Sequence, residues 1–399
     1  MSLIRWLAFP VLGGLLSAAA WRDDEPTYHE DIKPLLAKKC LPCHQNGGAS
    51  PFHLATYSDV KRRGSLIRWV CIVGSMPPVD ADSDLVPMAA IERVRDDELQ
   101  VLQEWVRTGL KEGKANPAAP APKFAWRLDP PGDIIINPDQ PGTLREEGAP
   151  YRKLFVLEAG ASAGKAITGF DITPTQPYVW RHAYLAVVPR DVKAEAVFSP
   201  TGVDTKYLVG AWAPGHFAWS SPVGVLVGKE DKLVVSALIQ PSGKPETSDF
   251  ELGLRTSTPS TAQMSWLSLG NKEFAIVPAD GGQTLRAETT LDHDVDLISV
   301  VPECRTFAQQ VRLVAILPSG ESKRILAVRS WDLNWQGAYQ PAKPLRLLKG
   351  TKIVAEIDYD NSGHSGGNRE QRPTVSVRFG PGEGDDLFWV HLQTISRVP

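Results

Sequence analysis

The residues with the clearest chemical spacing lie between Cys40 and His44, where the chain reads Cys-Leu-Pro-Cys-His. Two thiols three positions apart can each add to one vinyl group of a single porphyrin, and the imidazole of His44 can then reach the iron as proximal ligand. A redox dithiol or half of a zinc site are the alternatives. A zinc site needs a second ligand pair nearby, and a redox dithiol is typical of a βαβ setting; the sequence shows neither. We therefore expect one covalently bound haem c, held by Cys40, Cys43 and His44.

Met76 is the residue best placed in the sequence to complete the coordination of that iron. It lies in the segment 74–78, and Pro77 biases Met76 towards an extended backbone. A Met/His ligand pair raises the reduction potential and fills the coordination sphere, which suits electron transfer. Met76 could instead be an ordinary core residue, which would leave the sixth position open. Met88 and His53 are weaker candidates for this position.

Two helical patterns flank the motif and would cover the haem. Residues 30–39 and 97–112 carry apolar side chains at helical spacing. Asp96 is the candidate N-cap of the second helix, and Gly113 is its candidate stop. The apolar faces consist of Ile32, Leu35 and Leu36 in the first helix and Leu99, Leu102, Trp105, Val106 and Leu110 in the second. We expect a small helical haem domain over residues 25–115.

Residues 1–20 have the pattern of a secretory signal peptide. Arg5 precedes an apolar run that ends in three alanines at 18–20, which fits the small-residue rule for cleavage. The run is shorter than the roughly 20 residues of a membrane span. An uncleaved anchor is the alternative, and a membrane contact is expected only in that case. Because c-type haem is attached outside the cytoplasm, we expect a periplasmic or extracellular protein.

Composition adds few constraints beyond these. The chain has 399 residues and a formal net charge of −3, so nothing suggests a nucleic-acid partner. Its 33 glycines and 33 prolines indicate many turns. Two cysteines lie outside the motif, Cys71 and Cys304. They could form a disulfide, which the expected compartment allows, or they could be two separate buried thiols.

The remainder of the chain has the pattern of a β protein. A Pro/Ala-rich linker over residues 116–125 precedes a region with little helical periodicity. Short apolar or alternating runs between Gly/Pro turns are typical of antiparallel sandwiches, and the length favours two of them, at residues 126–262 and 263–399. The main runs are residues 153–157, 183–188, 232–239, 297–301, 311–317 and 351–357.

Several N-terminal stretches carry a resemblance to a known kind of module. They are Asp31 to Leu36, the Cys40 to His44 motif, Met76 to Pro78 and the helix around Trp105. In combination they resemble small bacterial cytochrome c domains, which occur in secreted proteins fused to modules similar to copper monooxygenases.

Four stretches further along the chain extend the resemblance to the β-rich part. They are residues 232–245, 296–302, 331–336 and 345–362. They are similar to the copper type II, ascorbate-dependent monooxygenase family, of the peptidylglycine α-hydroxylating type, and the likeness spans roughly residues 126–399. It implies two jelly-roll-like antiparallel β-sandwiches, each presenting one copper site across a solvent gap.

The resemblance also implies where copper ligands would lie, and most of those positions carry other residues here. The first site would use a His-His pair, where this chain has Arg181 and His182, and a third ligand where it has Leu238. The second would use His-x-His where residues 303–305 read Glu-Cys-Arg, and a Met where residues 387–389 read Leu-Phe-Trp. One imidazole cannot hold a copper. His182 is thus either a residual copper ligand or a buried, hydrogen-bonded strand histidine, and no bound copper is expected.

Other side chains could supply a metal site only through the fold. His216 and His293 could contribute if the chain brings them close to His182. Glu303 and Cys304 could form an unusual site, although the adjacent Arg305 argues against a cation.

A calcium site is a further alternative in the C-terminal part. Asp358, Asp360 and Asn361 carry suitable oxygens, but their spacing fits no complete calcium loop, so a polar turn is expected. His364 lies in a Gly-rich stretch and is expected to face solvent.

These patterns predict a multidomain protein, with a small helical cytochrome c domain followed by two jelly-roll-like β-sandwiches. The expected function is single-electron transfer through one haem, with the copper-free β module as a docking or scaffold surface and no catalytic residues. The partner would be a redox protein or a membrane-bound electron-transfer complex. The alternative is a copper- or other-metal-dependent monooxygenase whose haem domain supplies electrons. A third possibility is a binding module whose haem senses redox state.

Overall fold

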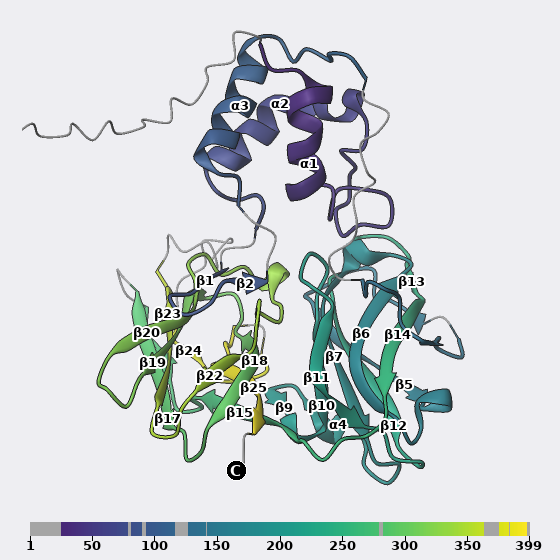
Figure 1. Cartoon of the computed structure of the whole chain (residues 1–399), viewed down its shortest axis with the longest axis vertical. Helices are drawn as coiled ribbons and strands as arrows, with labels where there is room; N and C mark the ends of the chain where they lie inside the picture. Colours follow the sequence, from purple (N-terminus) through teal and green to yellow (C-terminus); the bar gives the residue numbers. More distant parts are fainter. Residues whose placement is uncertain are drawn as a thin grey trace, which may run out of the picture.

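The chain folds into one helical unit and two β units. The computed structural model describes residues 25–78, 81–89, 93–115, 127–140, 142–278, 282–362, 375–382 and 384–396. The helical unit lies above two β units that stand side by side (Figure 1). The protein is thus mostly β, with several antiparallel sheets and a few N-terminal helices. This confirms the prediction of a helical N-terminal part followed by a β-rich part. The predicted signal peptide at 1–20, the linker at 116–125 and His364 lie outside the described residues.

The helical unit forms around the two predicted helices. The first comprises a π-helical turn, η1 (Tyr28–Ile32), and α1 (Lys33–Lys39), and the second is α3 (Asp96–Arg107). Both predicted apolar faces meet in one cluster, in which Ile32, Leu36, Leu102 and Trp105 are buried. The apolar side chains at helical spacing in the two segments therefore mark the faces through which the two helices contact each other.

The ends of α3 differ from the prediction by a few residues. Arg95, rather than Asp96, is the N-cap, because its backbone N–H donates to the Glu98 carboxylate at 2.8 Å. The helix ends at Arg107 instead of continuing towards Gly113. Gly109 adopts a φ of 95°, a left-handed conformation that favours glycine and ends a helix.

A third helix, α2 (Tyr57–Ile72), was not predicted. Thr56 caps its N-terminus by accepting a hydrogen bond from the Asp59 backbone N–H at 3.2 Å. The helix buries Val60 and Ile67, yet its other face also carries apolar side chains, and these are exposed. The apolar residues on two faces hide the helical period in the sequence. The exposed apolar residues are Leu66, Trp69 and Ile72 within the helix and Val73 just beyond it.

The first β unit consists of two four-stranded antiparallel sheets with a common core. One sheet has the order β10 (Leu208–Trp212), β7 (Trp180–Val188), β12 (Lys232–Ile239) and β5 (Tyr151–Glu158). The other has the order β11 (Trp219–Leu226), β6 (Ala166–Pro174), β14 (Phe250–Ser257) and β3 (Ile134–Ile136). Alternate residues of both sheets, such as Leu185, Val235 and Leu252, fill the space between them, so the period of two in the sequence places one face of each strand in this core. The short elements are β4 (Gly142–Thr143), β8 (Phe198–Ser199), β9 (Gly202–Val203), β13 (Thr247–Ser248), α4 (Ala194–Val197), and the 3-10 turns η2 (Gly160–Ser162), η3 (Pro177–Val179) and η4 (Thr205–Tyr207).

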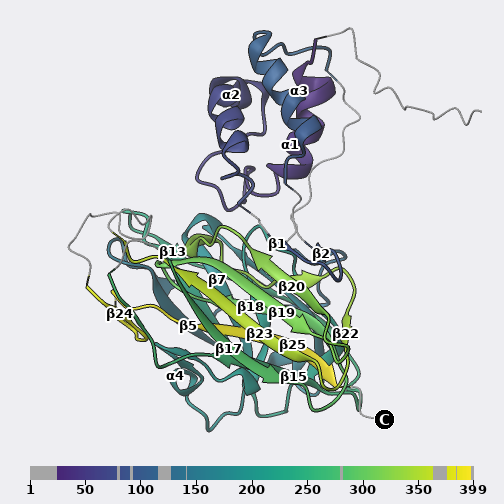
Figure 2. The same cartoon turned by 90° about the vertical axis from the view of Figure 1, so that its left-hand side faces the viewer.

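The second β unit repeats this arrangement. One sheet has the order β15 (Met264–Gly270), β25 (Trp389–Ser396), β18 (Val295–Glu303) and β22 (Leu345–Leu347). The other contains β20 (Ser322–Val328), β19 (Ala308–Ile316), β23 (Lys352–Tyr359) and β17 (Gln283–Thr290), and the two sheets enclose a second core (Figure 2). Each of the six strand-like runs named in the sequence lies within a strand of one of the two units, except that the runs 311–317 and 351–357 each extend one residue beyond their strand. The remaining short elements are β16 (Ala275–Ile276), β24 (Val377–Arg378) and the 3-10 turn η5 (Leu333–Trp335).

A segment within the range expected for the haem domain pairs with the second β unit. β1 (Ala81–Asp82) adds to the edge of β20, and β2 (Met88–Ala89) pairs with β21 (Gln340–Pro341). Arg324 of β20 forms an ion pair with Asp84 at 2.6 Å. The chain that follows Met76 is therefore anchored to the second β unit.

The two β units are in direct contact through the sheet that contains β7 and the sheet that contains β25. A hydrophobic cluster between them includes Tyr184, Val234 and Val301. A buried polar contact joins them as well, because Trp219 Nε1 donates to Gln393 Oε1 at 2.7 Å. The resemblance implies a solvent gap at this place, and the structure shows packed side chains instead.

Candidate functional site

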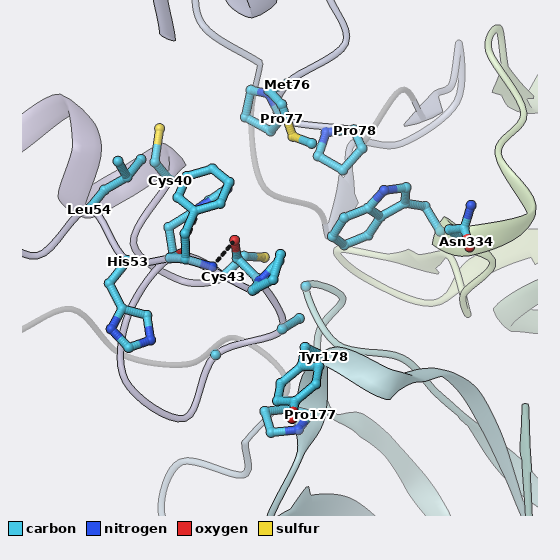
Figure 3. A pocket seen from close by; sticks show the side chains of 18 of the residues that line it. Cys40, Cys43, His53, Leu54, Met76, Pro77, Pro78, Pro177, Tyr178 and Asn334 are labelled. Atoms are coloured by element: carbon cyan, nitrogen blue, oxygen red, sulfur yellow. Dashed lines mark hydrogen bonds between the residues drawn. The ribbon is translucent and has the colours of Figure 1, made fainter. Parts of the chain in front are cut away.

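A cavity of about 950 Å³ lies where the helical unit meets the two β units. All four residues predicted to bind the haem, Cys40, Cys43, His44 and Met76, line it. Figure 3 shows Cys40, Cys43 and Met76 around this cavity. Its volume lies within the range of roughly 300–1,000 Å³ that is typical of ligand and cofactor sites. The fold thus brings Met76 to the same cavity as Cys40, which lies 36 positions earlier in the chain.

The motif forms a tight turn that continues α1. The Cys40 N–H donates to the Leu36 carbonyl at 2.8 Å, and the His44 N–H donates to the Cys40 carbonyl at 2.9 Å. The Cys43 N–H also donates to the Cys40 carbonyl, at 3.1 Å. This turn directs both sulfurs and the imidazole to the same cavity, which the spacing of the motif requires.

The loop over residues 45–54 folds back onto the motif and holds it. The Leu54 N–H donates to the His44 carbonyl at 2.8 Å, and the Ser50 N–H donates to the Cys43 carbonyl at 3.1 Å. Gly48 passes so close that a Cβ there would lie 2.1 Å from the Cys43 carbonyl oxygen. A side chain at this position would displace the motif, so the turn requires glycine there.

The imidazole of His44 is oriented as a metal ligand would be. Its Nδ1 lies 3.3 Å from the Phe52 carbonyl oxygen, and the two rings are 4.6 Å apart between centroids. A hydrogen bond from Nδ1–H to a backbone carbonyl leaves Nε2 with a free lone pair. Burial lowers the pKa of His44, although the Phe52 carbonyl opposes this, so the ring is neutral at neutral pH, as ligation requires.

Burial keeps the cysteine thiols around the cavity in their protonated form. Burial raises the pKa of Cys40, raises that of Cys43 to about 12 and raises that of Cys71, which also lines the cavity, to about 11. Redox-active Cys-x-x-Cys pairs have lowered thiol pKa values, so this environment does not favour a redox dithiol. Cys304 lies in the core of the second β unit, and Cys71 and Cys304 are both free, which answers the open question of a disulfide between them.

Met76 lies in the segment 73–78, here called the strap, which follows the end of α2 and lines the cavity with Met76, Pro77 and Pro78. Its backbone N–H donates to the Val70 carbonyl at 3.3 Å, and the adjacent Pro77 and Pro78 line the same cavity. Figure 3 shows Met76 on the side from which this strap enters, while the His53 ring points away from it. Met88, the other candidate ligand, lies in β2 and packs against the core of the second β unit.

The β units form the remaining wall of the cavity. Gly215 of the first unit, which has a φ of 86°, approaches so closely that a Cβ there would lie 3.2 Å from Cys43 Sγ. Trp335 of the second unit is as near, at 3.2 Å from the same Cβ position. No sequence pattern predicts this wall, because its residues lie in short turns far apart in the chain, such as η3 and η5. Tyr178 and Asn334 contribute to it from the two β units (Figure 3).

His182, the candidate residual copper ligand, lies away from this cavity at the junction of the β units. It is on β7, opposite Leu238 of β12, and its side chain is buried. Beside it, Arg152 of β5 forms an ion pair with Glu303 of β18, and His391 of β25 lies 3.7 Å from the same carboxylate. Sequence reasoning missed Arg152 and His391, which no local pattern marks.

The surroundings of His182 are unfavourable for a second positive charge. Burial, assisted by the positive charge of the nearby Arg152 guanidinium, lowers the pKa of His182 to about 3, although Glu303 opposes this. His182 is buried, as one of the two alternatives predicts, but neither ring nitrogen has a hydrogen-bond partner among the described residues. Across the described ranges, no three His, Cys, Asp or Glu side chains are placed to hold a metal ion together.

Of the other candidate metal ligands, His216 lies near enough to His182 to lower its pKa, while His293 and Asp358 have other neighbours. His216 is buried against Gly337, where a Cβ would lie 2.4 Å from the ring, and His293 is partly exposed beside Asp292. The Asp358 carboxylate accepts hydrogen bonds from the Arg312 guanidinium at 2.6 and 2.8 Å. That guanidinium takes the place a calcium ion would need at Asp358.

Replacing His182 with Gln is expected to weaken the pH dependence of stability. The folded-state pKa of about 3 lies below the unfolded value of about 6.5, so the neutral ring contributes stability above pH 6.5 that is lost as the pH falls towards 3. In this pH range the unfolded chain binds one proton at His182 that the folded chain does not bind. This proton makes the free energy of unfolding change by about 1.4 kcal/mol per pH unit. Urea unfolding between pH 6 and 4 should show a slope lower by that amount in His182→Gln. An equal slope in wild type and variant would contradict this prediction. His293→Gln is the control, because it removes an imidazole that is partly exposed.

Comparisons with known proteins give little information about this chain. No family description matches the sequence, and no curated protein matches it. Among solved structures, PNGF-II is 10% identical with a TM-score of 0.30, over 66% of this chain and 65% of that chain. The PBSX exported protein XepA is 11% identical with a TM-score of 0.19, over 66% and 87% of the two chains. The VP2 subviral particle of infectious bursal disease virus is 13% identical with a TM-score of 0.19, over 66% and 72%. Likenesses at these TM-scores carry no argument about function.

Among the described residues, no helix is both long enough and apolar enough to cross a bilayer.

Proposed function

We propose that this protein is a c-type cytochrome that transfers single electrons through one covalently bound haem. The observation that carries the proposal is the meeting of Cys40, Cys43, His44 and Met76 at one cavity of about 950 Å³. In this proposal the helical unit is a cytochrome c-like domain and the two β units are jelly-roll-like sandwiches. The haem, when bound, supplies a reversible one-electron iron centre.

The residues around the cavity fit a haem in three respects. The cavity is large enough for a cofactor and is lined mainly by apolar side chains, among them Leu54, Leu66 and Ile67. The His44 ring is neutral and offers Nε2 to a metal, since Nδ1 faces the Phe52 carbonyl at 3.3 Å. The lining also contains a soft thioether at Met76, and both thiols of the motif are free.

Each residue has a distinct task in this proposal. Cys40 and Cys43 would hold the haem through thioether bonds, formed by addition of each S–H across a vinyl group, which needs no oxidant. His44 and Met76 would be the protein ligands of its iron. A Met/His ligand pair would favour electron transfer over oxygen chemistry.

The β units act as a scaffold for this site. They form one side of the cavity with Tyr178 and Trp335, whose rings would cover part of the cofactor. They also fix the strap of Met76, since Asp84 beyond it is bound to Arg324 of β20 at 2.6 Å. These contacts support a role of the β module as a scaffold for the haem site. We also propose that the β module docks a redox partner or a membrane-bound electron-transfer complex.

A copper-dependent oxygenation is less consistent with the junction of the β units. The position that the resemblance assigns to a copper ligand, His182, lies close to the Arg152 guanidinium, whose positive charge opposes a cation there, although the His216 and His391 imidazoles also lie near it. The Glu303 carboxylate is already neutralised by that guanidinium. We therefore propose electron transfer as the function, in a periplasmic or extracellular protein where c-type haem is attached.

The double substitution Cys40→Ser with Cys43→Ser is expected to abolish covalent haem attachment. Wild-type protein, produced with the haem-attachment machinery, should keep its haem on a denaturing gel, and the double variant should not. Cys71→Ala is the matched control, because Cys71 is a thiol of the same cavity outside the motif. It should retain the haem band. A band of equal strength in the double variant, or none in wild type, would overturn the proposed function.

A further inference from the structure

Arg181 reaches the cavity through an irregularity in β7. In the pairing of β12 with β7, Leu238 lies opposite His182 and Ile239 lies opposite Trp180, so Arg181 has no partner. Such a bulge inserts one extra residue and re-aims its side chain. Trp180 and Ala183 face the core of the first β unit and His182 faces the junction, while Arg181 lines the cavity.

The guanidinium of Arg181 is held by neutral groups alone. Its Nε donates to Asn334 Oδ1 at 3.1 Å, and its Nη1 donates to the Tyr178 carbonyl at 2.8 Å. Burial lowers the pKa of Arg181, and Asp332, the acid that acts on it, opposes this without forming an ion pair. Within the described ranges Arg181 has no carboxylate partner. A half-buried cation without a counter-ion is costly and favours an anion beside it.

The cavity as a whole suits an anionic ligand. Its only acidic lining residue, in the part of the chain that the structure describes, is Glu246. That carboxylate is already occupied, since it accepts hydrogen bonds from the Tyr178 hydroxyl at 2.8 Å and the Ser242 hydroxyl at 3.0 Å. The basic lining residues are Arg63, Arg181 and Lys244, together with Lys39, which is already paired with Glu98 at 3.4 Å.

We infer that Arg181 binds a carboxylate of the haem, so that a residue of the first β unit anchors one propionate arm of a cofactor attached to the helical unit. This inference rests on the proposed function. A guanidinium fork can bind a carboxylate through two parallel hydrogen bonds, which fixes its orientation as well as its charge. Arg181 is thus a positioning residue that couples the cofactor to the β module.

Removal of this charge should lower the reduction potential of the haem. The oxidised haem carries one more positive charge than the reduced haem, and an unneutralised carboxylate stabilises it. We expect Arg181→Met, which keeps the volume, and Arg181→Gln to shift the one-electron equilibrium towards the oxidised form at least threefold, or about 28 mV at 59 mV per tenfold. The potential of these variants should also fall with rising pH as the carboxylate ionises, whereas Arg181→Lys should retain most of the wild-type value.

The experiment is redox titration, followed optically, of full-length protein at several pH values. Arg190→Gln is the matched control. Arg190 is an exposed arginine just beyond the C-terminal end of β7, and it pairs with Glu158 at 2.8 Å. Its replacement should leave the reduction potential unchanged. Two charge-removing variants are used so that one that fails to fold does not decide the outcome. If a haem-loaded Arg181→Met or Arg181→Gln shows the potential and pH profile of Arg190→Gln, the inference is wrong while the cytochrome function stands. If wild type carries no covalent haem, the proposed function itself fails.

Discussion

Replacing Met76 with Ala is expected to lower the reduction potential of the haem by on the order of 0.2 V, within the roughly 0.8 V over which axial ligands set haem potentials. A thioether ligand favours reduced iron, and Met76 is the thioether that lines the cavity with the Cys40 to His44 motif. The variant should also bind carbon monoxide when reduced, because one axial position is then open. Redox titration and difference spectra would measure both effects.

Two further variants separate ligation from packing at Met76. Met76→His refills the axial position, so it should exclude carbon monoxide and yet keep a low potential. Met88→Ala removes a methionine of β2 that packs against the core of the second β unit, and it should leave the spectrum unchanged. An unaltered spectrum and potential in Met76→Ala would show that Met76 is not a ligand.

Replacing Glu303 with Gln is expected to lower the free energy of unfolding by about 3–5 kcal/mol, because it leaves a buried guanidinium without its counter-ion. Glu303 is 4% exposed and pairs with Arg152 across the junction of the β units. Burial alone would raise the pKa of Glu303, but Arg152 and His391 lower it to about 2. The carboxylate therefore contributes stability above its unfolded pKa of about 4.3, and that contribution is lost as the pH falls towards 2.

Urea unfolding at pH 7 and at low pH would measure this effect. The difference between wild type and Glu303→Gln should be large at pH 7 and disappear near pH 2. Glu158→Gln, which breaks the exposed pair with Arg190, is the control, with an expected cost of about 0–1 kcal/mol. The combined change Arg152→Met with Glu303→Leu should recover most of the loss, since a buried pair can be replaced by apolar groups. A cost for Glu303→Gln no larger than that of the control would contradict this account of the junction.

Local patterns in the sequence predicted the parts of the structure that local physics determines. The helical face of Ile32 and Leu36 and the strand at residues 232–239 follow from a period of 3.6 or 2, and both are present. The motif from Cys40 to His44 and the strap of Met76 were also visible, because their residues are close in sequence or flanked by prolines. Their meeting at one cavity could be expected only from the chemistry of a shared cofactor.

Contacts between distant strands were not predictable from one sequence. Arg152 pairs with Glu303 over 151 positions of chain, and nothing near either residue marks the pair. His391 lies in an ordinary alternating strand, and its approach to Glu303 depends on the packing of the two β units. The bulge that turns Arg181 towards the cavity is likewise set by the register of β7 on β12. The helix α2 was missed for a different reason, since Leu66 and Trp69 place apolar side chains on its exposed face.

The most direct test of the central claim is to measure iron, copper and covalently bound haem in purified full-length protein, together with oxidised and reduced optical spectra. The proposed function predicts one iron per chain, all of it in haem that survives denaturation, with the spectrum of a Met/His-ligated centre and no stoichiometric copper. Protein made with the haem-attachment machinery but lacking covalent haem, or containing one copper or more per chain, would contradict it.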